Sequence, residues 1–244
     1  MCFSSAASFT AAALLIPAGL FTSLSCHRSG RAELLPLALS PTLFGLQQGL
    51  EGLVWLGLDR GGIEPLTQGA ALAYLFFAYG FWLAWLPWCA LRYGRGTVGL
   101  DRGAGDRGAG DGVGQGWLRG FFLFGLAMGL WLWLPLLLEP WRLQPIVLLG
   151  NLNYRTVTPL HAVLGLDQGS LLYGLVITLP LLLTGSRRLG AFALALALAF
   201  ALAWFGYRHA LPSSWCFFSA ALSLLLLWVV REPAPPPLAR PQQA

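Results

Sequence analysis

Long apolar runs alternate with short polar or glycine-rich connections along the whole chain. Most runs reach about 20 residues, the length that an α-helix needs to cross the hydrocarbon core of a bilayer. The pattern therefore predicts an all-α polytopic integral membrane protein with seven transmembrane helices. The predicted spans are Ser5–Ser25, Leu34–Leu58, Gly69–Leu91, Trp117–Leu138, Leu164–Thr184, Leu189–Tyr207 and Ser213–Val230.

The connections between these runs are too short to form a separate globular domain. We expect one seven-helix membrane domain over residues 1–230. Within it, residues 95–116 hold a tandem DRGAG repeat, and this glycine-rich composition predicts a flexible cytoplasmic linker. Residues 231–244 are proline-rich and predict a disordered tail. The connection Trp141–Gly165 is interpreted as a surface loop, with a re-entrant segment as the alternative.

The basic residues predict how the chain is oriented. All 15 are arginines, and the lack of lysine excludes Schiff-base chemistry and a phosphate-binding loop that depends on lysine. Cytoplasmic loops are enriched in arginine, and an amino terminus outside the cell gives eleven arginines inside against four outside. The inner set is Arg28, Arg31, Arg92, Arg95, Arg102, Arg107, Arg119, Arg187, Arg188, Arg231 and Arg240. The outer set is Arg60, Arg142, Arg155 and Arg208. Seven spans then leave the carboxyl terminus inside.

The net charge of +5 is explained by this topology. We therefore expect the lipid bilayer, and not a nucleic acid, as the main partner. Tryptophans near the ends of the apolar runs, Trp82 and Trp85 among them, are interpreted as aromatic belts at the membrane interfaces. Charges follow the first apolar run and do not precede it, so we expect a retained span and not a cleaved signal peptide.

The second span carries polar residues in its interior. Gln47, Glu51 and Trp55 are four residues apart and share one helix face, with Gln48 one step round. A carboxyl group in a spanning helix costs about 2.5–3.5 kcal/mol on insertion scales and usually faces a bundle interior or a wet cavity. Two interpretations remain open: hydrogen bonds that hold neighbouring helices together, or a functional cavity.

Two cysteines lie on the outer side toward which Glu51 leans. Cys2 precedes the first span, and Cys216 follows Trp215 at the start of the seventh. Removal of the initiator methionine would leave Cys2 with a free amine and a free thiol. Four interpretations remain open: small apolar residues at the headgroup level, a Cys2–Cys216 disulfide, ligands of a metal, or a nucleophile.

A metal site would draw on the same residues. Its candidate ligands are Cys2, Glu51 and Cys216, with His161 or His209 as weaker additions. The three histidines of the chain show no i, i+3 or i, i+4 pairing, so the sequence contains no strong zinc pattern. No cofactor can be named from these residues.

Four stretches together resemble an uncharacterised bacterial family of multi-spanning membrane proteins. They are MCFSSAASF at the amino terminus, Leu43–Leu58, Leu72–Pro87 and Ser213–Ser223. Members of that family open with Met-Cys-Phe-Ser and carry a late Trp-Cys-Phe-Phe segment. The resemblance implies a bacterial plasma-membrane protein but no activity. It implies that the following residues occupy motif positions: Cys2, Phe3, Ser4, Gln47, Glu51, Gly52, Trp55, Trp215, Cys216, Phe217 and Phe218.

The leading functional hypothesis is a cavity for a small ligand or metal in the outer half of the bundle. Its candidate residues are Cys2, Gln47, Gln48, Glu51, Trp55, Trp215 and Cys216. The alternatives are an intramembrane enzyme that depends on a thiol or a metal, a transporter of a small solute or protons, and a membrane scaffold.

Overall fold

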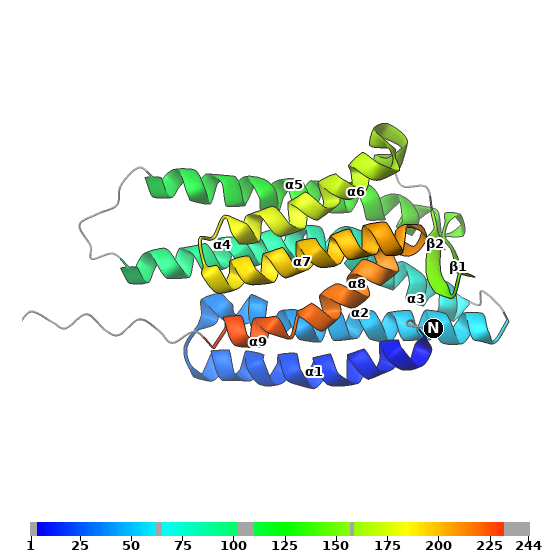
Figure 1. Ribbon diagram of the computed structural model, residues 1–244, viewed down its shortest axis with the longest axis horizontal. Coiled ribbons are helices and arrows are strands. Elements are labelled where there is room, and N and C mark those ends of the chain that lie inside the picture. The colour runs from blue at the N-terminus through cyan, green and yellow to red at the C-terminus, as the bar shows by residue number, and fades with distance from the viewer. Residues whose placement is uncertain (1–3, 62–64, 102–109, 157–158, 232–244) are drawn as a thin grey trace, which may run out of the picture.

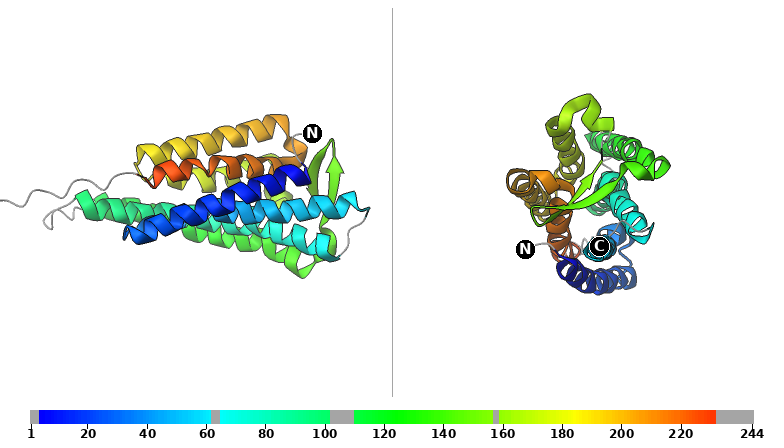
Figure 2. Two further views of the ribbon diagram at one scale, coloured as in Figure 1. Left: turned by 90° about the horizontal axis from the view of Figure 1, so that it is seen from below. Right: turned by 90° about the vertical axis from the view of Figure 1, so that its right-hand side faces the viewer.

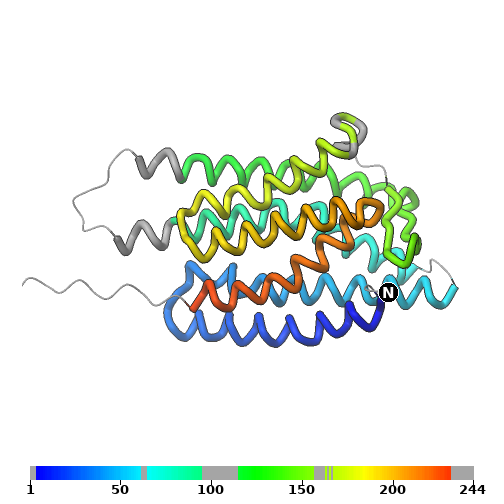
Figure 3. Tube along the Cα trace, viewed as in Figure 1, coloured from blue at the N-terminus to red at the C-terminus, as the bar shows by residue number. Residues whose placement is uncertain are grey.

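The computed structural model describes residues 4–61, 65–101, 110–156 and 159–231. Within these ranges the chain forms seven helical passes that run alternately in opposite directions (Figure 1, Figure 3). The passes are α1 (Ser5–Arg28), α2 (Leu35–Asp59), α3 (Pro65–Leu75) continued by the π-helical turn η2 (Phe76–Phe81) and α4 (Trp82–Asp101), α5 (Gly110–Leu138), α6 (Pro159–Leu182), α7 (Arg187–Gly206), and α8 (Leu211–Leu222) continued by α9 (Leu225–Val229). Three short 3-10 turns lie at helix ends: η1 (Ala32–Leu34), η3 (Pro140–Arg142) and η4 (Arg208–Ala210).

Five helices of the described chain are long and apolar enough to cross a membrane. They cover Ser5–Arg28, Pro65–Gly94, Gln115–Leu138, Arg187–Gly206 and Arg208–Val229. The polar side chains in the middle of α2 lower its hydropathy, and the apolar part of α6 is shorter, at Asp167–Leu182. Leucines such as Leu130 on α5 and Leu198 on α7 are exposed on the outer faces of the bundle. These apolar faces indicate contact with lipid, as expected for a membrane protein.

Small residues bring the helices close together. Gly52 of α2 leaves room for the ring of Phe9 on α1, because a Cβ at Gly52 would lie 2.8 Å from that ring. Gly125 of α5 packs directly on α4, where an added Cβ would come within 1.9 Å of the carbonyl oxygen of Leu83. Close approach through glycine is typical of helix pairs in membranes, where packing replaces the hydrophobic effect as the source of association.

A β-hairpin lies between α5 and α6, where the sequence predicted a surface loop. Strand β1 (Gln144–Leu148) pairs antiparallel with β2 (Asn151–Arg155). The turn residues Leu149 and Gly150 have φ values of 51° and 75°, the geometry of a tight hairpin turn. The hairpin crosses the end of the bundle (Figure 2) and buries Leu152 and Tyr154 against it. The surface-loop prediction is therefore wrong, and the fold is not purely helical.

The predicted linker is also shorter than expected. Helix α4 continues to Asp101 and α5 begins at Gly110, so both ends of the segment 95–116 are helical. Residues 102–109 lie outside the described residues, as do residues 232–244 of the predicted tail.

The fifth pass begins earlier than the predicted Leu164, because α6 starts at Pro159. Helix α6 bends at Gly165, whose φ of 78° is not helical.

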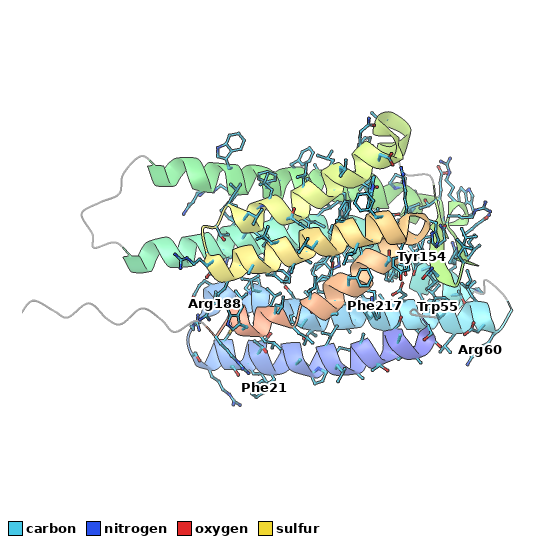
Figure 4. All side chains as sticks on the ribbon, viewed as in Figure 1. Phe21, Trp55, Arg60, Tyr154, Arg188 and Phe217 are labelled. Carbon is cyan, nitrogen blue, oxygen red and sulfur yellow. The ribbon has the colours of Figure 1, made fainter. Side chains whose placement is uncertain are left out.

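Arginines cap a helix at the end of the bundle opposite the hairpin. Arg60 lies at the end that carries the hairpin, and Arg188 lies at the opposite end (Figure 4). There, the guanidinium of Arg31 donates to the carbonyl oxygen of Val230 at 2.8 Å, and that of Arg188 donates to Trp228 at 3.2 Å. Arg31 from the α1–α2 connection and Arg188 from the first turn of α7 thus cap the end of α9, where the carbonyl of Trp228 also accepts from the backbone N–H of Arg231 at 3.3 Å.

Candidate functional site

The polar face of α2 points into the bundle, as its helical spacing predicts. Gln47, Gln48 and Glu51 have exposed fractions of 0%, 0% and 1%. The hydroxyl of Ser213 on α8 donates a hydrogen bond to Oε1 of Glu51 at 2.5 Å. The carboxyl group therefore joins α2 to the first turn of α8. No basic side chain is paired with it among the described residues.

Two stacked tyrosines extend this polar cluster toward the hairpin. The side chain of Tyr74 on α3 lies beside both Glu51 and Cys216, and its hydroxyl donates to the carbonyl oxygen of Pro212 at 3.3 Å. Its ring stacks on Tyr154 of β2, with centroids 4.9 Å apart. Figure 4 shows Trp55, Tyr154 and Phe217, from α2, β2 and α8, gathered at this end of the bundle. Four elements thus surround the buried carboxyl group.

Two polar groups in this region, Nε1 of Trp55 and the hydroxyl of Tyr154, have no hydrogen-bond partner among the described residues. The side-chain amides of Gln47 and Gln48 lie beside the thiol of Cys216 and the carboxyl group of Glu51, respectively. A buried polar group left without a partner costs about 1–3 kcal/mol, and folded proteins keep few of them. Each of the two unpaired groups can donate to a buried water, and of the two only Tyr154 also lines the pocket described below.

Gln47 has a clear structural role as well. Its Oε1 accepts a hydrogen bond from Nε1 of Trp82 at 2.7 Å, and the ring of Trp82 stacks on Phe44 at 3.7 Å between centroids. This arrangement joins α2 to α4 in the core. The interpretation of Trp82 as a belt residue is therefore wrong, because its side chain is almost wholly buried. Trp85 is half-buried and donates to the hydroxyl of Ser40 at 3.0 Å.

A pocket of about 310 Å³ opens beside this cluster, between the hairpin and the ends of α6, α7 and α8. Its inner surface is mainly aromatic, from Tyr79, Tyr173, Phe200, Trp204 and Trp215. The π-helical turn η2 shapes one wall, because Tyr173 donates to the carbonyl oxygen of Ala78 in that turn. Its polar lining residues include Asn153, Tyr154, Arg155, Thr156, Arg208 and His209.

Cys216 connects the pocket with the buried carboxyl group. Its side chain lines the pocket and also lies close to Tyr74, Gln47 and Glu51. The sequence prediction that Glu51 and Cys216 lie near each other agrees with this geometry. Trp215, the neighbour of Cys216, forms part of the same wall.

The predicted role of Cys2 lies beyond this description. Cys2 is outside the described residues, and Cys216 is a free buried thiol, so the structure does not show the disulfide considered from the sequence.

The structure gives no support to a metal site. Over the ranges that it describes, no three His, Cys, Asp or Glu side chains gather into a group that could hold a metal ion. His209 lies at the pocket, with its Nε2 3.4 Å from Nδ2 of Asn151. His161 belongs to the first turn of α6, but its side chain is outside the description, as is Cys2. A metal bound by Cys2, Glu51 and Cys216 therefore stays a prediction.

Four residues of the site were not anticipated in this role: Ser213, Tyr74, Tyr154 and Trp82. Ser213 lies three residues before Cys216, so the helical spacing that grouped Gln47 with Glu51 could also have placed it on the same face. Tyr154 could have been found from the alternation of NLNYR, which predicts a strand with every second side chain buried. Nothing in the sequence distinguishes Tyr74 from the other aromatic residues of its span.

Comparison of the chain with family models, with curated proteins and with solved structures finds no match. The family resemblance stated from the sequence stays a prediction, and the function is argued below from the site alone.

Proposed function

We propose that this chain is a seven-span protein of a bacterial plasma membrane that binds a small ligand in the outer half of its bundle. The observation that carries the proposal is the position of Cys216, which lines the 310 Å³ pocket and lies beside the buried Glu51 cluster. A pocket of this volume, with aromatic walls and a few converging polar groups, has the anatomy of a small-molecule site.

The proposed orientation rests on the arginines. With the hairpin end outside, the four arginines of the connections at that end face the exterior, and those at the opposite end face the cytoplasm. In this arrangement α2 and α6 complete the seven spans, although α2 is less apolar than the others. The polar residues in its middle, from Ser40 to Glu51, are all buried, and the exposed Asp59 lies at its end, so we expect no lipid contact with the buried set.

The cavity interpretation explains more of the site than helix association alone. The hydrogen bond between Gln47 and Trp82 would serve association, and so would the bond between Ser213 and Glu51. Association does not explain Trp55, whose buried indole N–H has no partner in the described chain. A carboxyl group is also more costly than an amide for holding helices together. Trp55 and Glu51 do not line the 310 Å³ pocket, so we explain their buried polar groups as contacts for water beside the ligand site.

Cys2 remains part of the proposal from the sequence alone. It precedes Ser4, the amino-terminal cap of α1, and lies outside the described residues.

The test is protection of Cys216 from a small neutral thiosulfonate by a neutral aromatic molecule, naphthalenemethanol. The protein is held in lipid nanodiscs, and modification of each native cysteine is followed by peptide mass spectrometry. We expect saturable protection of Cys216. A Leu198→Cys variant reports partition into lipid, because Leu198 is 67% exposed on the outer face of α7, and its new thiol should not be protected.

Equal protection of the two thiols, or none at Cys216, would contradict a binding pocket. No contact among the described residues specifically favours an enzyme, a transporter or a scaffold. Ligand binding is therefore the function that the geometry supports best.

A further inference from the structure

The mouth of the pocket is positively charged. Arg155 at the end of β2 and Arg208 in η4 both line it, together with His209. Arg208 is neutralised by an ion pair with Asp167 and also lies over the ring of Trp204, 5.1 Å from its centroid. Among the described residues, the other ion pair joins Arg142 to Glu139, so Arg155 is paired with no carboxylate in the described chain. One guanidinium at the pocket is thus left to meet an anion.

The walls hold aromatic rings in fixed orientations. Trp215 lies at their centre, with Tyr173 and Phe200 edge-on to it at 5.2 and 4.9 Å between centroids. Nε1 of Trp215 donates to the carbonyl oxygen of Leu196 at 3.3 Å, which holds the indole in place. Rings fixed in this way give a planar aromatic molecule faces and edges to pack against.

The side of the pocket formed by the hairpin carries unused hydrogen-bond donors. The hydroxyl of Tyr154 has no hydrogen-bond partner among the described residues, although the residue is only 6% exposed. The buried hydroxyl of Thr156 also has no partner among them. Burial raises the pKa of Tyr154, so its phenol remains protonated and can donate at neutral pH. Successive side chains of a strand point to opposite faces, so Tyr154 is buried beside the Glu51 cluster while Arg155 is exposed at the mouth.

We propose that the pocket takes a small aromatic organic anion, whose ring packs against Trp215 and whose acidic group meets Arg155 at the mouth. This inference rests on the proposed function, because it names the ligand class of the same pocket. A guanidinium binds carboxylate, phosphate and sulfonate groups through paired hydrogen bonds.

A cationic ligand fits less well. It would meet Arg155 and Arg208 at the mouth, while the carboxyl group of Glu51 is not among the residues that line the pocket. The volume of about 310 Å³ is at the lower end of ligand pockets and limits the anion to one or two rings.

The experiment compares four probes of similar size by their protection of Cys216 in nanodiscs of zwitterionic phosphatidylcholine. Naphthoate is the aromatic anion, naphthalenemethanol its neutral analogue, naphthylmethylammonium its cationic analogue, and decanoate a non-aromatic anion. We expect naphthoate to protect at concentrations about tenfold lower than naphthalenemethanol, because bonds to a charged group are stronger than neutral ones. Decanoate and the cation should protect less well than naphthoate.

Variants of Arg155 then locate the origin of the preference. Arg155→Gln should remove the advantage of naphthoate over naphthalenemethanol, and Arg155→Lys should keep part of it. Arg60→Gln is the matched control, because Arg60 is an exposed arginine at the same end of the bundle that does not line the pocket. It should leave the preference unchanged. Unaltered circular dichroism would confirm that each variant is folded.

The outcomes separate the two proposals. If naphthalenemethanol protects as well as naphthoate, or if Arg155→Gln keeps the preference, the pocket binds a ligand but the inference about an anion is wrong. If decanoate matches naphthoate, the site takes anions without selecting an aromatic ring, and the aromatic part of the inference is wrong. If none of the probes protects Cys216, the proposed function itself fails.

Discussion

Replacement of Ser213 by alanine tests the hydrogen bond that joins α2 to α8. The hydroxyl of Ser213 donates to Glu51 at 2.5 Å, and each residue is 1% exposed. Hydrogen bonds between helices in membranes contribute about 0.6 kcal/mol on average and up to about 1.7. Loss of the donor also removes a partner of a buried carboxyl group, which costs about 1–3 kcal/mol where no replacement is found. We therefore expect Ser213→Ala to lower the free energy of unfolding by about 1–2 kcal/mol.

Ser214→Ala is a matched control for this change. Ser214 is equally buried, but its hydroxyl donates to the carbonyl oxygen of Ala210 within the same helical segment, at 2.9 Å. Its removal leaves no charged or interhelical partner unsatisfied, so the expected cost is below about 0.5 kcal/mol.

A double-mutant cycle with Glu51→Gln isolates the interaction. The glutamine amide can still accept from Ser213 but is a weaker partner, so Ser213→Ala should cost less in that background. The expected coupling energy between positions 51 and 213 is about 1 kcal/mol. The assay is equilibrium unfolding in mixed micelles, followed by circular dichroism. Equal effects of Ser213→Ala and Ser214→Ala, or a coupling energy near zero, would refute the assignment of this bond.

Three further predictions concern packing, the core hydrogen bond and the orientation. Gly125→Ala should cost about 1–3 kcal/mol through a clash with the backbone of α4, whereas Gly120→Ala, with open space around it, should be near neutral in the same unfolding assay. Trp82→Phe should destabilise by about 1–3 kcal/mol, because it leaves a buried amide oxygen of α2 unpaired. Trp85→Phe, at a half-buried site, should cost less in the same assay. An Arg60→Cys thiol should react with a membrane-impermeant maleimide from outside intact cells; reaction only after permeabilisation would reverse the proposed orientation.

The helical passes follow the hydropathy of the chain closely. An apolar run of the length of a span has few alternatives to a helix, because every backbone polar group must be satisfied without water. The prediction for Leu189–Tyr207 corresponds to α7, at Arg187–Gly206, for this reason. The hairpin was harder to recognise. Its strands are five residues each, and IVLLG lacks the alternation that distinguishes a strand from a short apolar loop.

Only the part of the site that lies on α2 could be predicted, because there the helical spacing of polar residues identifies a common face. Gln47 and Glu51 share a face of one helix, so their common burial follows from spacing alone. Their partners come from other helices, and the rotation of those helices depends on packing that a single sequence does not specify. Ser213 and Ser214 illustrate the limit: both are buried serines, yet one bonds Glu51 across the bundle and the other bonds its own helical segment.

The central claim is that a pocket at the hairpin end of the bundle reaches Cys216. It is tested most directly by the rate at which Cys216 of the wild-type protein reacts with a small neutral thiosulfonate, compared with Cys89. Both thiols are buried in packed core clusters, but Cys216 also lines the pocket, and Cys89 does not. We expect Cys216 to react at least about tenfold faster, because the reagent can reach it through the pocket. Equal rates, or a Cys216 that reacts only after denaturation, would contradict the account.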